Sequence, residues 1–166
     1  MPCLLPDYGE LRRWKKVEVL PFEPQDYEQV MALWQETEGI TLREVDSRDW
    51  ILAYLARNPG LSFVARDGDV LVGAVLAGTD GRRGYLQHLA VALSYRGRGV
   101  GRGLAERVLE ALSGAGIAKC HLMVRAENEA AKAFWQHVGW TLRDDIVVMS
   151  HTHPRGREPL NNRAVS

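Results

Sequence analysis

The stretch Ser94–Leu104, which reads SYRGRGVGRGL, interleaves three arginines with four glycines. It follows residues 85–91, whose apolar character is typical of a β-strand. After it, apolar residues recur at every fourth position, which predicts a helix: Val100, Leu104, Val108 and Leu112. A glycine-rich turn between a strand and a helix presents unpaired backbone N–H groups at the positive end of the helix dipole. The stretch therefore predicts a phosphate-binding site.

Other roles for Ser94–Leu104 fit less well. A disordered arginine–glycine tract would not be flanked by regular elements. A dinucleotide-binding fingerprint requires the pattern GxGxxG. If the pattern starts at Gly97, its last glycine is replaced by Arg102, and if it starts at Gly99, by Leu104. A tight turn with solvated arginines stays open at this point. The whole chain is neutral, with 21 lysines and arginines against 21 aspartates and glutamates, so we expect no nucleic-acid partner.

Length and composition indicate one domain of ordinary globular balance. The chain has 166 residues, of which 46% are hydrophobic and 25% charged. We expect an N-terminal extension at 1–16, a single domain at 17–151 and a polar tail at 152–166. No apolar run reaches the ~18 residues of a membrane span and the N-terminus lacks the order of a secretory signal, so we expect a cytoplasmic protein with no membrane partner. Cys3 and Cys120 fit no zinc-binding spacing, and no metal site is expected.

Hydrophobic periodicity divides the domain into alternating strands and helices. We expect strands at 16–20, 61–66, 70–78, 85–91 and 117–124, and one or two more within 140–150. Helices are expected from Pro24 onward, from Asp46 or Ser47 to Asn58, from Val100 to Gly114, and from Asn128 to Gly139. The order of these elements indicates an α/β (α+β) fold.

Two motifs resemble signatures of the GCN5-related N-acetyltransferase (GNAT) family. Arg96–Gly101 is similar to the family's [Gln/Arg]-x-x-Gly-x-[Gly/Ala] segment, which follows its fourth strand. Asn128–Trp140 resembles the family's N-x-x-A-x-x-[FL]-Y-x-x-x-G-[FY] helix. The resemblance covers residues 17–151, and the turn before Tyr85 looks like that of the bacterial YpeA-type, ribosomal-protein-acetyltransferase-like subgroup. It implies a GNAT fold: a central mixed sheet of six to seven strands, about four helices, and fourth and fifth strands that splay apart.

The resemblance also implies that the chain binds acetyl-CoA and transfers an acetyl group to an amine. The glycine-rich turn would hold the pyrophosphate through Arg96, Gly97, Arg98, Gly99, Val100, Gly101 and Arg102. The backbone of Leu89, Ala90 and Val91 would pair with pantetheine, as an added strand would. Asn128 would touch the cofactor from the next helix, and Lys132 would either meet a CoA phosphate or stay a solvated lysine.

The catalytic side chains that the resemblance implies are missing from their usual positions. Trp135 stands where many members have a tyrosine that acts as the acid. Met123 stands where one subgroup has a glutamate base. An indole N–H donates a hydrogen bond but is not a usable acid, and the apolar face that Trp135 shares with Phe134 favours core packing.

Other family members place a histidine or glutamate in the fourth strand, at positions that correspond here to Tyr85 and Gln87. In ideal alternation Tyr85 and Gln87 share a face with Leu89, and His88 points to the other face unless a β-bulge re-aims it. The backbone N–H of Val91 is expected to stabilise the oxyanion. The identity of the base stays open, because positioning and an oxyanion donor, with solvent as the proton acceptor, would also serve.

The acceptor side is expected between the first two helices. The loop Glu36–Asp46 carries several acids and is flanked by Trp34 and Trp50. This composition suits a cationic amine of a small molecule or a protein, although a solvated acidic loop has the same composition. A non-catalytic acyl-CoA sensor of the same fold is the alternative function, since both usual catalytic side chains are absent. Family members often dimerise, so a homodimer is one expected state.

Overall fold

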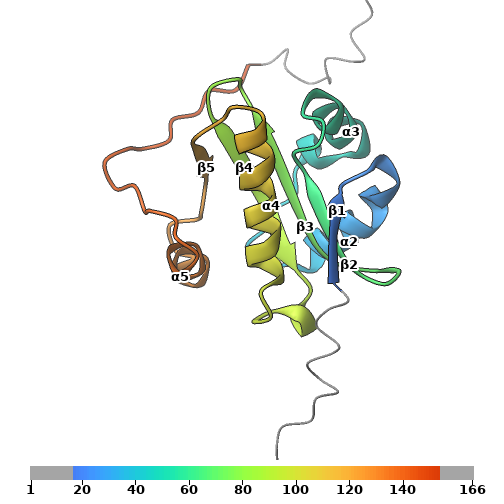
Figure 1. The fold of residues 1–166 in the computed structure, drawn as a ribbon. Coiled ribbons are helices and arrows are strands. Elements are labelled where there is room, and N and C mark those ends of the chain that lie inside the picture. The colour runs from blue at the N-terminus through green and yellow to red at the C-terminus, as the bar shows by residue number, and fades with distance from the viewer. Residues whose placement is uncertain (1–16, 154–166) are drawn as a thin grey trace, which may run out of the picture.

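The computed structural model of the chain describes residues 17–153. Within this range the centre is a five-stranded sheet in the order β1-β2-β3-β4-β5 (Figure 1). Neighbouring strands run antiparallel, except β4 and β5, which are parallel. The strands are β1 (Val17–Pro21), β2 (Phe63–Asp67), β3 (Val70–Thr79), β4 (Gly84–Val91) and β5 (Cys120–Leu122).

Helices cover both faces of the sheet (Figure 1). On one face lie α2 (Tyr27–Glu36) and α3 (Arg48–Arg57). On the other lie α4 (Val100–Gly114) and, toward the β5 edge, α5 (Glu129–His137). Short 3-10 turns introduce α2 and α3 and follow β4: η2 (Pro24–Asp26), η3 (Glu44–Asp46) and η4 (Leu93–Tyr95). Among the described residues this gives the mixed sheet and four α-helices of the GNAT fold, as predicted.

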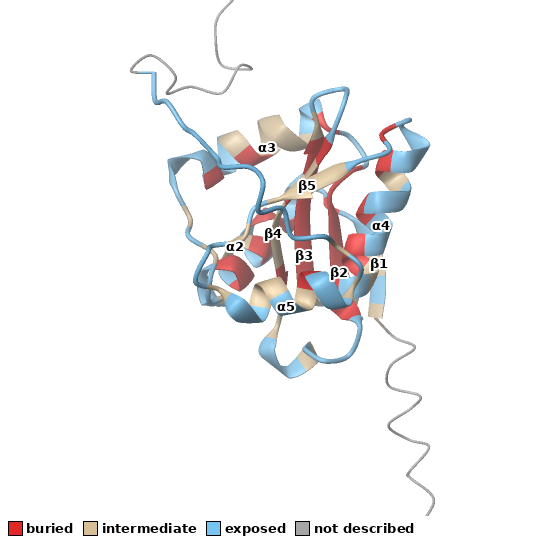
Figure 2. Ribbon diagram, turned by 90° about the vertical axis from the view of Figure 1, so that its left-hand side faces the viewer, coloured by how far each residue is buried: buried red, intermediate tan, exposed pale blue. Residues whose placement is uncertain are grey.

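The core consists of two apolar clusters separated by the sheet. The fourfold spacing of Val100, Leu104, Val108 and Leu112 buries one stripe of α4, as the sequence predicted. Val30, Trp34 and Ile51 fill the opposite cluster under α2 and α3. The central strand β3 is buried on both faces (Figure 2), which explains its near-continuous apolar sequence.

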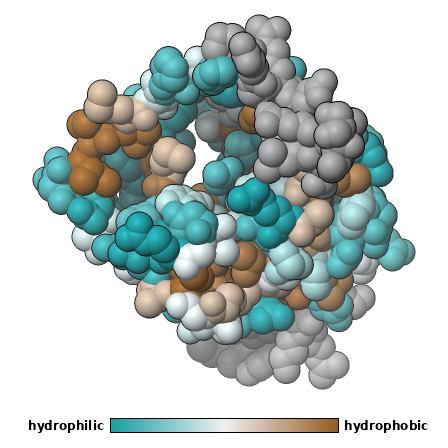
Figure 3. All heavy atoms as spheres, turned by 90° about the horizontal axis from the view of Figure 1, so that it is seen from above, coloured by the Kyte–Doolittle hydropathy of each residue, from teal (hydrophilic) through white to brown (hydrophobic). Residues whose placement is uncertain are grey.

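The prediction of a six- or seven-stranded sheet is wrong for the described residues, because no strand forms within 140–150. This segment forms an arc that stands away from the body (Figure 1). Its apolar side chains are mostly exposed, and apolar atoms gather on this protruding side in Figure 3: Leu142, Ile146, Val147, Val148 and Met149. β5 has only three residues, not the expected 117–124, and so short an edge offers few ladder hydrogen bonds. Strand propensity without a partner edge does not make a strand.

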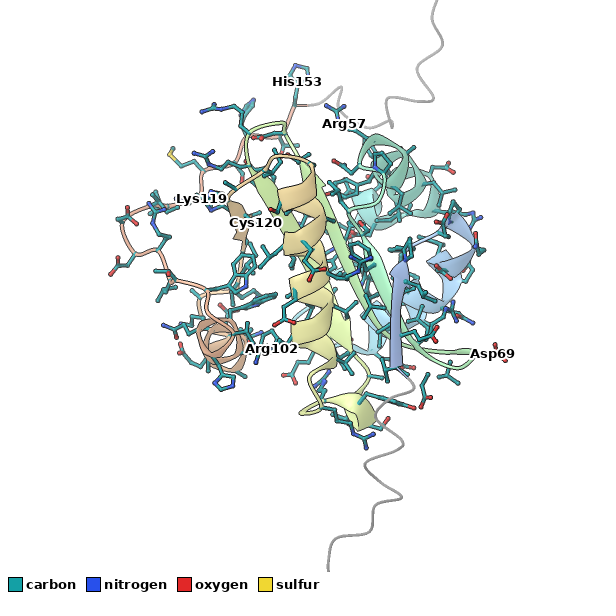
Figure 4. All side chains as sticks on the ribbon, in the orientation of Figure 1. Arg57, Asp69, Arg102, Lys119, Cys120 and His153 are labelled. Atoms are coloured by element: carbon teal, nitrogen blue, oxygen red, sulfur yellow. The ribbon has the colours of Figure 1, made fainter. Side chains whose placement is uncertain are left out.

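Cys120 lies on β5 and packs against the α4 cluster (Figure 4). Burial raises the pKa of its thiol from 9.0 to about 11. Only the thiolate reacts with alkylating agents, so we expect iodoacetamide at pH 8 to modify Cys120 roughly 100-fold more slowly in the folded protein than in the denatured protein. Peptide mass spectrometry measures the rate at Cys120 separately from that at Cys3. Equal folded and denatured rates at Cys120 would contradict this burial.

Two further structural findings concern residues 17–153. No helix in this range combines the length and apolar character that a bilayer crossing requires. In the same range no three of the metal-ligating His, Cys, Asp and Glu side chains gather into a cluster that could hold an ion.

Candidate functional site

A cleft opens where β4 and β5 diverge. The two strands pair only from Gly84 to Leu86 on β4, opposite Cys120 to Leu122 on β5. Beyond that point β4 continues to Val91 without this neighbour, so the fourth and fifth strands splay apart as predicted. The cavity has a volume of about 1020 Å³, and its walls are the end of β4, the start of α4, the loop after α2 and the first turns of α5.

The glycine-rich turn forms one end of this cleft. Gly97 and Gly99 have φ angles of +70° and +80°, a left-handed conformation that side chains disfavour, and Gly99 is the N-cap of α4. The N–H of Gly103 donates to the carbonyl of Gly99 at 2.9 Å, so it is the first amide of α4 with an acceptor inside the helix. The preceding amides of Val100, Gly101 and Arg102 belong to the unpaired N–H groups of a helix start.

The structure brings five residues of the glycine-rich turn to the wall of the cavity. Gly97, Gly99, Val100, Gly101 and Arg102 all line it, and Figure 4 shows Arg102 on the side of α4 that faces α5. At Gly101 an added Cβ would lie 3.3 Å from Cζ of Phe134. A side chain at this buried position would therefore press against Phe134 in the wall of the cleft.

The arginines of the glycine-rich stretch differ in their position relative to the cavity. Arg96 lines the cavity, and its Nε donates to the carbonyl of Val91 at 3.0 Å, which ties the turn to the end of β4. The guanidinium of Arg98 lies over the ring of Tyr95, 5.3 Å from its centroid, and Arg98 does not line the cavity. Direct charge at the cleft therefore comes from Arg96 and Arg102 rather than from Arg98.

Backbone groups at the end of β4 point into the gap. The N–H of Ala92 donates to Val72 of β3 at 2.8 Å. Because amides alternate direction along a strand, the N–H groups of Val91 and Leu89 point to the opposite edge, where β5 has diverged. Leu89, Ala90 and Val91 all line the cavity, but the same alternation turns the amide of Ala90 toward β3.

Residues of α5 close the other side of the cleft. Asn128 is the N-cap of α5, and its Oδ1 accepts the N–H of Ala131 at 3.0 Å while the residue lines the cavity. Trp135 also lines the cavity, packed edge-to-face against Phe134. Lys132 instead forms an ion pair with Glu129 at 2.5 Å and does not line the cavity.

A β-bulge in β4 changes which side chains face the cleft. Ala74 pairs with Ala90 and Leu76 pairs with Gln87, so Val75 alone lies opposite both His88 and Leu89. His88 adopts φ +50°, the one positive φ outside glycine among the described residues. The extra residue breaks the two-residue alternation of the strand.

Ideal alternation would place His88 on the α4 side of the sheet and Leu89 on the α2 side. The bulge reverses both positions. Leu89 packs against the α4 cluster, whereas the ring of His88 lies 5.0 Å from that of Trp34 on α2. Gln87 pairs with Leu76, a member of the α2 cluster, and so shares that side. The expectation that Tyr85 and Gln87 share a face with Leu89 is therefore wrong.

The side chain of Tyr85 forms its contacts outside the cleft. Its hydroxyl donates to Oδ2 of Asp80 at 3.1 Å, and this hydrogen bond raises the pKa of Tyr85 above 10.0. The ring lies 6.2 Å from that of His121 on β5. Neither Tyr85 nor Gln87 lines the cavity, so the structure does not bring either side chain to the predicted site of reaction.

The loop after α2 supplies wall residues that motif matching missed. Thr37, Glu38 and Gly39 line the cavity. Gly39 has φ +88°, and an added Cβ there would lie 2.9 Å from Nδ2 of Asn128. The loop after α2 therefore lies close to Asn128 at the start of α5. The signal in the sequence is the single glycine in an acidic loop, which marks a left-handed turn but not its partner.

Comparison with known proteins identifies the family. The family model described as the acetyltransferase (GNAT) family matches residues 27–140. The chain belongs to this family. It is 30% identical over 133 residues to an acetyltransferase of Sodalis glossinidius (strain morsitans), covering 80% of this chain and 93% of that protein. It is 32% identical over 132 residues to an acetyltransferase of Pectobacterium atrosepticum, with the same coverage of 80% and 93%.

Solved structures share the GNAT fold. The PaiA N-acetyltransferase of Thermoplasma acidophilum, in complex with coenzyme A, superposes with a TM-score of 0.70 at 20% identity, over 77% of this chain and 91% of that one. The aminoglycoside acetyltransferase AAC(6')-Iy, in complex with a bisubstrate analogue, superposes with a TM-score of 0.68 at 18% identity, over 82% and 99%. Membership in the family confirms that the chain is an acetyltransferase, as its two motifs predicted.

Proposed function

We propose that this GNAT protein binds acetyl-CoA in the cleft between β4 and β5 and transfers the acetyl group directly to an amine. The observation that carries this proposal is the set of unpaired N–H groups at the start of α4, which opens into a cleft of about 1020 Å³. Backbone N–H groups at a helix start suit a pyrophosphate. The relatives whose structures hold coenzyme A or its bisubstrate analogues share this fold.

The residues around the cleft fit the two ends of the cofactor. Val100, Gly101 and Arg102 would hold the pyrophosphate through their amides, with the side chains of Arg96 and Arg102 adding charge-assisted contacts. The pantetheine would run along the gap edge of β4 and pair with Leu89 and Val91, as an added strand would.

Acetyl-CoA supplies the acetyl group as a thioester, whose thiolate leaves readily. The chain's own contribution begins with the N–H of Val91, which points into the gap and would donate to the thioester carbonyl oxygen. Fixing the thioester beside the acceptor raises the effective concentration of both partners. Trp135 would pack against the bound group rather than donate a proton, since an indole N–H is not a usable acid.

The acceptor that the walls favour is a cationic amine. Glu38 lines the cavity from the loop after α2 and is exposed, so its carboxylate is available to a protonated amine. The same loop contributes Thr37 and Gly39 to the wall, and the acceptor would approach past this loop.

A turnover assay tests the proposed function. The protein is mixed with acetyl-CoA and, in turn, spermidine, kanamycin and a peptide with a free N-terminus, and free CoA is followed with a thiol reagent. We expect at least one amine to release CoA above the rate without amine, with the acetylated amine detected by mass spectrometry. Binding of acetyl-CoA without release by any amine would favour the non-catalytic acyl-CoA sensor instead.

Gly39→Ala tests whether the loop after α2 shapes the cofactor site. Gly39 and Gly81 have nearly equal φ angles of +88° and +89°, but only the Cβ at position 39 would meet another residue, Asn128. Each change should cost about 1 kcal/mol of stability through backbone strain. Only Gly39→Ala should also weaken acetyl-CoA binding, by roughly five- to tenfold or about 1 kcal/mol, because it displaces Asn128. Titration calorimetry measures the affinity, and equal affinities for the two variants would argue against the contact.

A further inference from the structure

We propose that His88 is the base that removes the proton from the acceptor amine, acting through water, and that Asp46 positions its ring. This inference rests on the proposed acetyl transfer and names a part of it that neither the motifs nor the relatives assign. It depends on a His–Asp pair that the bulge of β4 creates beside the cleft.

The pair joins residues that lie 42 positions apart in the sequence. Nε2 of His88 lies 2.8 Å from Oδ1 of Asp46, and the two side chains are 23% and 7% exposed. The other oxygen of Asp46, Oδ2, accepts the backbone N–H of Arg43 at 2.8 Å. A carboxylate held in this way accepts a hydrogen bond from Nε2–H, which leaves Nδ1 of His88 as the nitrogen with a free lone pair.

The fold holds this histidine in an uncommon conformation. His88 has φ +50° inside the bulge, a region that few residues other than glycine and asparagine occupy. Such conformations persist where the surrounding structure determines them, and they gather at active sites. Without the bulge the side chain would point to the α4 side, away from Asp46.

An aromatic side chain holds the ring of His88 from the α2 side. Trp34 is fully buried and its ring packs edge-to-face on His88 with centroids 5.0 Å apart. The Trp34 Nε1–H has no hydrogen-bond partner among the described residues, so the neighbouring indole does not compete for Asp46.

Other titratable and charged groups near the pair are few. The hydroxyl of Tyr27 on α2 donates to the backbone carbonyl of Asp46 at 3.1 Å, and burial raises the pKa of Tyr27 above 10.0. Arg48 lies over the ring of Tyr27 and is paired with Glu28 at 3.7 Å. Tyr27 therefore stays neutral through the pH range in which histidine titrates.

The pair lies beside the part of the cleft where the acetyl group is expected. His88 directly precedes Leu89, which lines the cavity, and lies three residues before Val91. Asp46 ends the loop that begins with the wall residues Thr37–Gly39. His88 does not itself line the cavity, but its partial exposure leaves it accessible to water, so one or more waters would complete the path.

The acceptor enters as an ammonium, and Nδ1 of His88 takes one proton from it through water. The neutral amine then forms the new C–N bond with the acetyl carbon while the C–S bond breaks and the thiolate leaves with the electron pair. The second proton of the amine nitrogen passes to the thiolate or to solvent, and the imidazolium returns its proton to solvent.

The test compares pH profiles of kcat for the wild type, His88→Asn and Asp46→Asn, using the amine of the panel that releases CoA fastest. Asparagine tolerates a positive φ, so His88→Asn preserves the backbone of the bulge. His121→Gln is the matched control, since His121 is a partly exposed strand histidine that does not line the cavity. Thermal unfolding and titration calorimetry with acetyl-CoA check the fold and the cofactor site of each variant.

The wild-type kcat should rise with pH and then level off, since a general base acts only in its unprotonated form. His88→Asn should lower kcat near neutral pH by about 100-fold, recover at alkaline pH where the amine deprotonates unaided, and bind acetyl-CoA within about twofold of the wild type. Asp46→Asn should reduce the plateau by about tenfold, since the ring loses the carboxylate that positions it. His121→Gln should match the wild type.

Two results would overturn the inference while leaving the proposed function intact. One is a His88→Asn profile that follows the wild type, and the other is a loss of activity explained by weaker acetyl-CoA binding. Absence of turnover by the wild type with every amine would contradict the proposed function itself, and the inference with it.

Discussion

Replacing Gly101 by aspartate should abolish acetyl-CoA binding at concentrations that saturate the wild type. Gly101 lies in the first turn of α4 and lines the cleft, with Cζ of Phe134 3.3 Å from the place of an added Cβ. A side chain there narrows the approach to the amides, and a carboxylate also repels the pyrophosphate. We expect a loss of affinity of at least 100-fold, or roughly 3 kcal/mol, measured by titration calorimetry.

Gly103→Asp is the control for this change. It adds the same charge to the first turns of the same helix, but an added Cβ at Gly103 meets nothing within 4 Å and the residue does not line the cavity. Because Gly101 is buried, thermal unfolding of both variants separates a loss of stability from a loss of binding. Equal affinities for the two variants would show that the phosphates bind elsewhere.

Replacing Leu104 by alanine should destabilise the protein by about 3 kcal/mol and lower Tm by roughly 10 °C. Leu104 is fully buried between α4 and the sheet. Its Cδ1 lies 2.9 Å from the place where a Cβ at Gly73 of β3 would be. Truncation leaves a cavity at this close contact, and the same contact holds the start of α4 over the sheet. Chemical and thermal unfolding measure the loss.

The matched control is Leu109→Ala on the same helix. Leu109 is 40% exposed, so this change keeps the helix propensity of alanine and removes little buried surface; we expect less than about 1 kcal/mol of destabilisation. If Leu104→Ala lowers the free energy of unfolding as little as Leu109→Ala does, the buried apolar stripe does not hold α4 on the sheet.

The glycine-rich turn and the helix after it were predictable from the sequence because they depend on local features. A glycine-rich turn followed by a fourfold apolar repeat determines both the left-handed turns at Gly97 and Gly99 and the buried stripe of α4. Asn128 was recognised in the same way, since an N-cap asparagine and its helix are contiguous in sequence. The splay of β4 and β5 came from the resemblance to the family and is confirmed by their short pairing.

The contacts of His88 were not predictable, because they depend on the tertiary structure. The bulge that turns His88 toward α2 arises from the pairing between β3 and β4. The sequence shows what such a bulge would do to His88, but not that the bulge forms. Asp46 was expected only as a helix cap or a loop acid, and nothing in its neighbourhood indicates the imidazole 42 residues away. The missing strands after α5 reflect the same limit, because Ile146–Met149 has strand composition but no partner edge.

Hydrogen–deuterium exchange with and without acetyl-CoA tests most directly whether the cleft between β4 and β5 holds the cofactor through the backbone. The amides of Val100, Gly101 and Arg102 precede the first helical hydrogen bond of α4, and those of Leu89 and Val91 point into the gap, so we expect them to exchange fast in the free protein. We expect acetyl-CoA to slow exchange in these two segments and to leave the distant turn at 80–83 unchanged. Protection confined to other segments, or no protection at saturating acetyl-CoA, would contradict the account.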